Sequence, residues 1–294
     1  MNIIAKRKIF LGISGALIFV SIAAVTVYGL RVGPDFEGGT LWQVRVPSAT
    51  TEQIRDVLGT TLGVHNATVY AQIETNSFFV RVGHISEDDH QRYLPALRDR
   101  FGAGVEELSF ETIGPAIGRE LRDKAIIATI LVMLGISLYV AYAFRRVSYP
   151  IRSWKYGIVT LLTLIHDAII PVGFFAILGR VAGVEVDINF VVALLVIMGF
   201  SVHDTIVVFD RIRENIMLAR GNFNLPAIIN ESIGQTFARS VNTSLTLVLV
   251  LLAMFFFGPA SLQYFVLTIM IGVIAGTYSS IFIASPALLL VGRK

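Results

Sequence analysis

Six long apolar runs constrain this chain more than any other feature of its sequence. A run of about 18 or more apolar residues is long enough to cross a bilayer as a helix. The runs are Ile9–Leu30, Ala125–Phe144, Tyr156–Leu178, Asp187–Phe209, Thr243–Gly258 and Leu262–Leu290. Only 15% of the 294 residues are charged, against roughly 25% in soluble domains. The sequence therefore predicts an α-helical polytopic membrane protein with six transmembrane helices.

The ends of three runs need comment. The first run is longer than the apolar core of about 7–15 residues in a signal peptide, so we expect a retained helix. The fifth run is short, and its helix can begin earlier, near Phe237. The last run is interrupted by Pro286, so its final residues are expected in the membrane interface.

The basic residues are distributed unequally between the two sides of these helices. Short segments on the side of the termini carry thirteen Lys and Arg residues, whereas those on the other side carry only Arg180. The positive-inside rule then places both termini in the cytoplasm, and long segments are exempt from it. We expect three parts: residues 1–30 with the first helix, an extracytoplasmic domain over 31–124, and the remaining five helices over 125–294.

Residues 31–124 read as a small α+β domain. Alternating patterns predict strands at Thr40–Val46, Ala67–Glu74, Ser77–Gly83 and Val105–Thr112, and apolar spacing predicts helices at Thr50–Leu62 and Ser86–Phe101. Thr75-Asn76 would join the two middle strands. The order βαββαβ is that of a ferredoxin-like domain. This fold hosts many functions and does not choose one.

The domain carries no recognisable chemistry. His65, His84 and His90 lack the spacing of metal ligands, and no nucleophile or acid/base arrangement is visible. The chain contains no Cys and no phosphate-binding glycine motif. We therefore expect no metal, no cofactor, no nucleic-acid partner and no enzymatic activity. A binding or lever role is favoured, with energy from an ion gradient or a partner.

Ionisable residues occur inside two of the apolar runs. His166 and Asp167 lie in the third run, and His203 and Asp204 in the fourth. Such residues are costly in a bilayer and usually face a bundle interior, a water path or a partner. Arg239 precedes the fifth run and would hold Asp204 ionised until the arginine moves. Two acid/His pairs and an arginine favour a proton path, with structural hydrogen bonding between helices as the alternative.

Glycines in the runs indicate close helix packing. Gly272 and Gly276 form a GxxxG pattern in the last run, and Gly12 and Gly15 lie in the first. Packing within this bundle is favoured over packing against another membrane protein.

Five segments resemble the SecF family of protein-export membrane subunits, in order and across nearly the whole chain. Residues 33–39, GPDFEGG, are similar to its G-x-D-F-x-G-G, and residues 114–118, GPAIG, to its G-P-x-x-G. Residues 204–215, DTIVVFDRIREN, resemble the signature D-T-x-V-V-x-D-R-I-R-E-N. Residues 239–244 and 276–280 match two further segments. In the family pattern His203 stands where many relatives have Asn, and Pro34 replaces an aliphatic residue.

The resemblance implies a function and partners that the residues alone do not show. Family members pair with SecD to form a twelve-helix bundle of the resistance–nodulation–division type, of which this chain would supply half. That complex associates with the SecYEG channel and is thought to use proton flow to move the emerging unfolded polypeptide outside the bacterial inner membrane. YajC is a further candidate partner, and the lipid bilayer surrounds the complex.

The resemblance also assigns roles to residues. Asp204 and Arg239 would be the proton relay, with His203, Asp167 and His166 as candidate contributors. The junction between the first helix and the outer domain would be shaped by Gly33, Asp35, Phe36, Gly38 and Gly39. A motif at the cytoplasmic end of the fourth helix comprises Asp210, Arg211, Arg213, Glu214 and Asn215.

Two other functions remain open from the sequence. The chain can be a purely structural partner of SecD and the channel, whose polar residues only join helices. It can also be half of a proton-driven lipid or drug exporter, although an outer domain over residues 31–124 is small for capturing substrates. Na⁺ remains an alternative to H⁺, because a carboxylate near Ser201 and Thr205 does not separate the two ions.

Overall fold

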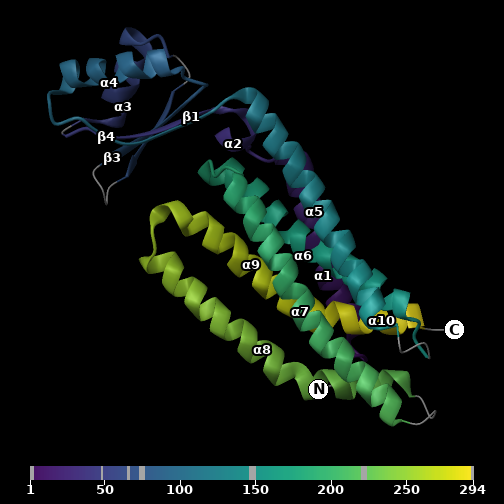
Figure 1. The fold of residues 1–294 in the computed structure, drawn as a ribbon. Helices are drawn as coiled ribbons and strands as arrows, with labels where there is room; N and C mark the ends of the chain where they lie inside the picture. Colours follow the sequence, from purple (N-terminus) through teal and green to yellow (C-terminus); the bar gives the residue numbers. More distant parts are fainter. Residues whose placement is uncertain are drawn as a thin grey trace. The chain divides into compact units, whose positions relative to one another are not determined.

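The computed structural model describes residues 3–47, 49–64, 67–72, 77–145, 150–219 and 224–292. The chain forms two compact units, one of Met1–Arg31 with Ile126–Lys294 and one of Val32–Ala125. Figure 1 shows the elements of both. His65 and the turn expected at Thr75-Asn76 lie outside the described residues.

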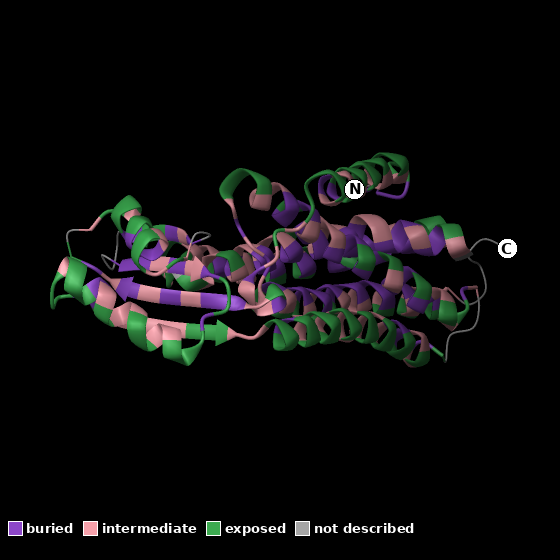
Figure 2. Ribbon diagram, turned by 90° about the horizontal axis from the view of Figure 1, so that it is seen from above, coloured by how far each residue is buried: buried purple, intermediate pink, exposed green. Residues whose placement is uncertain are grey.

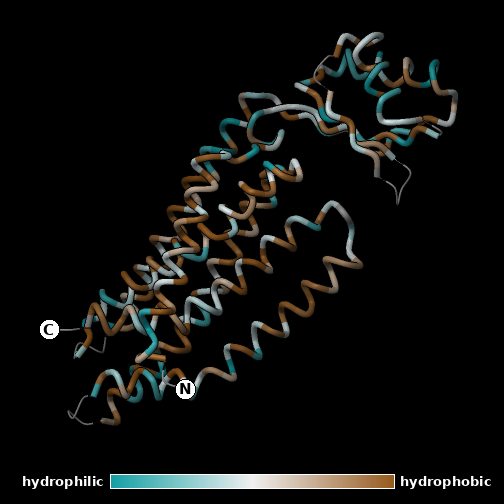
Figure 3. Tube along the Cα trace, turned by 180° about the vertical axis from the view of Figure 1, so that it is seen from behind, coloured by the Kyte–Doolittle hydropathy of each residue, from teal (hydrophilic) through white to brown (hydrophobic). Residues whose placement is uncertain are grey.

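Six helical segments of the described chain are long and apolar enough to span a membrane, which confirms the predicted number. Figure 3 shows how strongly apolar residues dominate them. The segments are α1 (Arg7–Tyr28), α5 (Pro115–Ala143), α6 (Ser153–Ala182), α7 (Ile188–Leu218), α8 (Leu225–Phe257) and the joined α9 (Gln263–Ser279), η3 (Ser280–Ala284) and α10 (Ser285–Gly292).

The helices extend beyond the apolar runs that predicted them. The helix of the fifth run begins at Leu225 rather than at Thr243 or Phe237. Its polar first half still buries one face, formed by Ile228, Ile229 and Ile233, and such a face keeps a helix folded despite low hydrophobicity. Likewise, α7 continues through the charged residues that follow Phe209.

The last helix is interrupted before Pro286. A π-helical turn covers Ser280–Ala284, and Pro286 follows as the second residue of α10. A proline is tolerated in the first turn of a helix, because the backbone N–H groups there have no intrahelical partner. The interruption therefore begins directly after Ser279, a residue of the polar cluster described below.

Helices α6, α7 and α9 form the core of the helical unit. Buried residues make up 50%, 44% and 56% of the most apolar stretch of these three segments, against 17% in α1 and α8 and 11% in α5. A Cβ on Gly276 of α9 would stand 2.9 Å from Ser201 Cβ of α7. By contrast, Gly12 and Gly15 of α1 have no atom within 4 Å of such a Cβ. The expected close packing within the bundle holds for the glycines of the last helix and not for Gly12 and Gly15, although α1 itself approaches α6 closely at Ser21 and Gly173.

The second unit contains an antiparallel sheet covered on one face by helices (Figure 1). Its elements are β1 (Gly39–Arg45), α3 (Thr51–Asp56) continued by η1 (Val57–Thr61), β2 (Thr68–Gln72), β3 (Ser77–Val82), α4 (Glu87–Phe101) and β4 (Glu106–Ile113). The strand order is β2-β3-β1-β4 with every neighbouring pair antiparallel. The element order βαββαβ is the one that the sequence predicts.

Local signals in the sequence begin both helices of this unit. Thr50 accepts a hydrogen bond from the Gln53 backbone N–H, and the Gln53 side chain accepts one from Thr50, which completes a capping box before α3. Ser86 caps α4 in the same way through the Asp89 N–H. Buried residues alternate along β1 in Figure 2, and their side chains, including Trp42 and Val44, form the core with α3 and α4.

An irregular register in β4 places a carboxylate on the helix-covered face of the sheet. Gln43 pairs with Ser109 but Val44 pairs with Glu107, so Leu108 is an extra residue. Such a bulge re-aims neighbouring side chains. Glu107 accepts hydrogen bonds of 2.6 Å from the Trp42 indole and also lies 2.6 Å from His90 Nε2 of α4. The carboxylate thereby joins β1, β4 and α4.

Candidate functional site

Asp204 lies in the middle of α7 with 2% of its surface exposed. Its Oδ2 atom is 3.5 Å from Ser244 Oγ of α8. The Thr277 hydroxyl of α9 donates in turn to Ser244 Oγ at 2.5 Å. One buried carboxylate is therefore linked to two neighbouring helices through a chain of two hydroxyl groups.

A second buried carboxylate, Asp167 of α6, has more partners. Its Oδ1 atom lies 2.8 Å from His166 Nδ1. Its Oδ2 atom accepts hydrogen bonds from Ser201 Oγ of α7 and, at 2.8 Å, from Ser279 Oγ of α9. His166 is also buried, and no described atom lies within hydrogen-bond distance of its Nε2. A buried charged group is tolerated when it is paired and hydrogen-bonded, as Asp167 is.

The two carboxylate clusters share two helices. On α7, Ser201 of one cluster lies three residues before Asp204 of the other, so both lie on the same side of the helix. On α9, Thr277 and Ser279 serve the two clusters separately. A change at either carboxylate therefore acts on α7 and α9, which also contact the other carboxylate cluster.

Two residues predicted for the relay are exposed. His203 of α7 and Arg239 of α8 both have open surface in this chain. Arg239 stands five residues before Ser244, which places the two side chains ~140° apart around α8. Among the described residues no ion pair joins Arg239 to Asp204. The structure brings Asp204 to hydroxyl groups and leaves Arg239 on the outer surface of α8.

The motif at residues 210–215 holds α7 against α8. Arg213 pairs with Asp210 at 2.6 Å, and Arg211 with Glu214 at the same distance. Between the helices, Arg211 Nε donates to the Gln235 side chain at 2.6 Å, and Asn215 Nδ2 donates to Ser232 Oγ at 2.8 Å. These groups act as a polar tie between two helices.

The junction motif forms a compact turn before the sheet. Gly33 precedes the short helix α2 (Pro34–Glu37), which contains Asp35 and the buried Phe36. Gly38 and Gly39 follow with φ of +82° and +153°, values that L side chains rarely adopt. The second glycine motif packs here, because a Cβ on Gly38 would stand 2.6 Å from Pro115 Cα. The glycine motifs at residues 33–39 and 114–118, far apart in the sequence, therefore contact each other.

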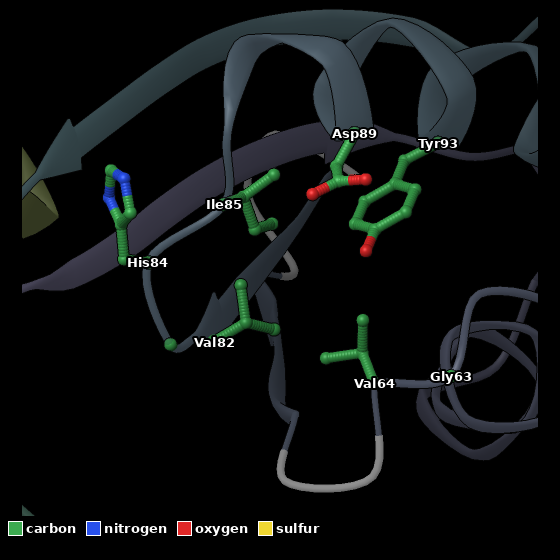
Figure 4. Close-up of a pocket in the computed structure, with 8 residues that line it drawn as sticks. Gly63, Val64, Val82, His84, Ile85, Asp89 and Tyr93 are labelled. Atoms are coloured by element: carbon green, nitrogen blue, oxygen red, sulfur yellow. The ribbon is translucent and has the colours of Figure 1, made fainter.

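A cavity of about 400 Å³ opens beside the sheet of the second unit (Figure 4). Val82, Ile85 and Val64 supply apolar walls, and Asp89 and Tyr93 of α4 point into it. Burial raises the pKa of the Tyr93 hydroxyl, and the Asp89 carboxylate raises it further. In the described part of the chain, no three His, Asp or Glu residues gather in a way that could hold a metal ion.

Sequence reasoning missed the hydroxyl partners of the carboxylates. Ser244, Thr277 and Ser279 fall within segments that resemble the family, but no role was assigned to them. One sequence feature could have identified them: Ser and Thr recur on one side of apolar helices, where a hydroxyl group has few possible partners other than a neighbouring helix.

Six apolar helices with two carboxylates in their buried core, together with a small antiparallel sheet domain in the same chain, define a multi-pass membrane protein with polar groups inside its helical bundle. Comparisons with known proteins narrow this class. The family model described as protein export membrane protein SecD/SecF, C-terminal, matches residues 95–294. The chain belongs to this family.

Curated relatives match along nearly their whole length. The protein translocase subunit SecF of Thermobaculum terrenum is 44% identical over 297 residues, which cover 97% of this chain and 92% of the relative. SecF of Anaerolinea thermophila is 36% identical, with 99% of this chain and 94% of the relative covered.

A solved structure is also similar. The crystal structure of SecDF, a translocon-associated membrane protein from Thermus thermophilus, matches 99% of this chain with a TM-score of 0.81 and 32% identity. SecDF in its super-membrane-facing form matches with a TM-score of 0.70. The chain spans 38% of the length of these SecDF chains.

Proposed function

We propose that this chain is a non-catalytic accessory subunit of the bacterial Sec protein-export machinery that couples the proton-motive force to late steps of polypeptide translocation. Family membership supports the export role. The observation that carries the coupling is Asp204, a buried carboxylate linked to α8 and α9 through Ser244 and Thr277. A carboxylate at the meeting point of three helices can change their packing when it gains or loses a proton.

The relay would work through charge and hydrogen bonding. With Asp204 ionised, its oxygens need donors, and the Ser244 hydroxyl lies at 3.5 Å. When Asp204 is protonated, its carboxyl group can itself donate a hydrogen bond and no longer needs the Ser244 hydroxyl as a donor. His203, exposed on α7, would pass a proton to or from a second chain, and Arg239, exposed on α8, would supply a fixed positive charge there. His166 and Asp167 are further candidates for the path. Two such states provide the alternation that transport requires.

A partner chain of the SecD type is the second part of the proposal. An exposed histidine and arginine inside or beside membrane-spanning helices are costly in lipid and usually meet protein or water. On α7, His203 lines up with the exposed Val192, Val196 and Gly199, and a Cβ on Gly199 would meet no atom within 4 Å. A small residue beside a polar one suits a close helix neighbour. The relation to SecDF, whose chain is longer, supports this partner.

The proposed setting follows the charge asymmetry of the sequence. Both termini would lie in the cytoplasm, the protein would reside in the bacterial inner membrane, and the sheet unit would face outward. There it would meet the unfolded polypeptide that leaves the SecYEG channel. YajC would be an additional membrane partner.

A structural role is the second candidate, and the Asp167 cluster favours it at that position. Its hydrogen bonds from Ser201 and Ser279 join α6 to α7 and α9, and the motif at 210–215 likewise ties α7 to α8. If Asp204 served the same purpose, the chain would act only as a scaffold. The exporter alternative gains no support from the described residues.

Export driven by an imposed proton gradient separates the two candidates. Vesicles would contain this chain, a SecD partner and the channel, with Asp204→Asn compared with wild type and co-purification as the control for assembly. We expect the variant to assemble and to lose the gradient-dependent stimulation. Export equal to wild type would assign Asp204 a scaffold role. Replacing the proton gradient by a Na⁺ gradient identifies the coupling ion.

A further inference from the structure

The two carboxylate clusters hold their helices very differently. One oxygen of Asp167 accepts hydrogen bonds from α7 and α9, and the other lies 2.8 Å from His166 Nδ1. In the part of the chain that the structure describes, Asp204 has one hydrogen bond to α8, at 3.5 Å, the upper limit of such a bond. From this contrast we infer that Asp167 is a positioning residue that holds α6, α7 and α9 as one block, so that protonation of Asp204 moves α8 against that block.

Close packing supports the block. Gly272 and Gly276 of α9 lie against Ile197 and Ser201 of α7, and a Cβ on either glycine would stand less than 3.0 Å from those side chains. Ser201 is therefore both a packing surface for α9 and a donor to Asp167. Such contacts have little room to slide, because packed interiors deform in discrete steps rather than continuously.

Helix α8 is attached mainly by apolar side chains, and in the described residues it has no close glycine contact like those between α7 and α9. It lies at one edge of the helical unit in Figure 1, and a smaller share of its apolar stretch is buried than in α6, α7 or α9. In mid-membrane Leu251 packs among apolar side chains of α7 and α9, and the polar contact with the block is Ser244, which lies between Asp204 and Thr277. Near Asn215 the polar contacts are partly exposed and lie beside apolar packing of Ile229 and Ile233. A change of charge at Asp204 therefore acts first on α8.

The inference deepens the proposed function and rests on its assignment of Asp204 as the group that changes protonation. It adds which element moves and which residue keeps the others together. His166 and Asp167 then belong to the block of α6, α7 and α9. The proton path continues from Asp204 toward α8 and the exposed Arg239 and His203. Removing Asp167 should loosen the block even when Asp204 is intact.

Distances between nitroxide labels test this independently of export. The chain has no Cys, so introduced pairs are its only labelling sites. One pair, at the exposed positions Met217 and Leu249, measures α7 against α8, and a second, at Met217 and Ile274, measures α7 against α9. Both would be measured in the full chain assembled with a SecD partner, with Asp204→Asn as the permanently neutral form of Asp204.

We expect Asp204→Asn to shift the α7–α8 distance by about 2 Å or more, in the range of helix shifts in other switches, and to leave the α7–α9 distance unchanged. Asp167→Asn should broaden the α7–α9 distribution. Ser279→Ala tests the same point with a smaller change. The matched control is Thr268→Val, because Thr268 is a buried hydroxyl of α9 that donates only within its own helix.

Three results would overturn the inference. Asp204→Asn can shift both distances together, it can shift neither, or Asp167→Asn and Ser279→Ala can leave the α7–α9 distribution as narrow as Thr268→Val does. The gradient-driven export assay reports on the proposed function separately. If Asp204→Asn leaves export unchanged but shifts the α7–α8 distance, the coupling role of Asp204 is rejected. The inference that α8 moves against the block of α6, α7 and α9 then still holds.

Discussion

Gly118 lies against the backbone that enters β1: a Cβ on Gly118 would stand 2.8 Å from the Gly38 nitrogen and 3.0 Å from the Phe36 carbonyl carbon. Gly118 is in the first turn of α5, and Gly38 ends α2. The two glycine motifs of the sequence thus form one contact, in which the start of a long helix rests directly on a backbone turn. Such an approach is open only to a residue without a side chain.

Gly118→Ala should therefore destabilise the sheet unit, whereas Gly114→Ala should not. The alanine methyl group of the first variant meets backbone atoms, which cannot rotate away, and overpacking of this kind costs about 1–3 kcal/mol. A Cβ on Gly114 meets no atom within 4 Å. Thermal unfolding of the two purified variants and wild type in the same detergent measures the difference. Equal melting temperatures for both variants would show that the turn can yield.

Gly276→Ala and Gly12→Ala form a second matched pair, this time inside the helical unit. The Cβ of the first would stand 2.9 Å from Ser201 Cβ and displace the donor to Asp167, so we expect a loss of about 1–3 kcal/mol. Gly12 faces open space, and alanine there gains helix propensity of up to about 1 kcal/mol. Thermal unfolding in detergent again provides the measurement, and a stabilised Gly276→Ala would contradict the packing argument.

The cavity beside α4 predicts a pH effect on the sheet unit. Burial, and then the Asp89 carboxylate, raise the pKa of Tyr93, whose ordinary value is about 10. Between that value and the raised one the folded chain binds more protons than the unfolded chain, so stability falls as the pH rises through this window. Tyr93→Phe should remove this part of the dependence.

Titration of tyrosinate absorbance, as the difference between wild type and Tyr93→Phe, measures the pKa directly. Asp89→Asn should lower it toward the ordinary value, because one of its two causes is removed. Asp88→Asn is the control, since Asp88 precedes Asp89 on the same helix and does not contribute to the shift. If Asp89→Asn leaves the Tyr93 pKa unchanged, burial alone would account for its rise.

The sequence predicted the six helices because apolar length is a direct requirement of the bilayer. It misplaced the start of α8, since the first half of that helix buries only one side and lacks a continuous apolar run. The sequence also placed both carboxylates inside membrane-spanning helices, but it led us to expect Arg239 next to Asp204. That step required knowing the rotation of α8, and the helical period alone does not fix which face meets α7.

The hydroxyl partners could not be predicted for a related reason. Ser244 and Thr277 belong to helices that meet only after the chain has folded, and the bond between them joins residues 33 positions apart. The bulge that turns Glu107 toward Trp42 is likewise invisible in the alternating pattern of β4, because one extra residue shifts every later side chain to the other face.

Ser244→Ala gives the sharpest test of the link between Asp204 and α8. The variant removes the hydroxyl between the carboxylate and Thr277 while leaving Asp204 itself in place. The Ser244–Asp204 bond is at the upper limit of length, so we assign it the contribution of an ordinary hydrogen bond, about 0.5–1.5 kcal/mol, and gradient-driven export should fall about 2- to 10-fold rather than disappear. Thr246→Val is the matched control on α8, because the Thr246 hydroxyl is exposed and donates only to the Thr243 carbonyl within its own helix. A loss as complete as that of Asp204→Asn would make Ser244 an obligatory part of the relay, and export equal to Thr246→Val would show that Asp204 acts without α8.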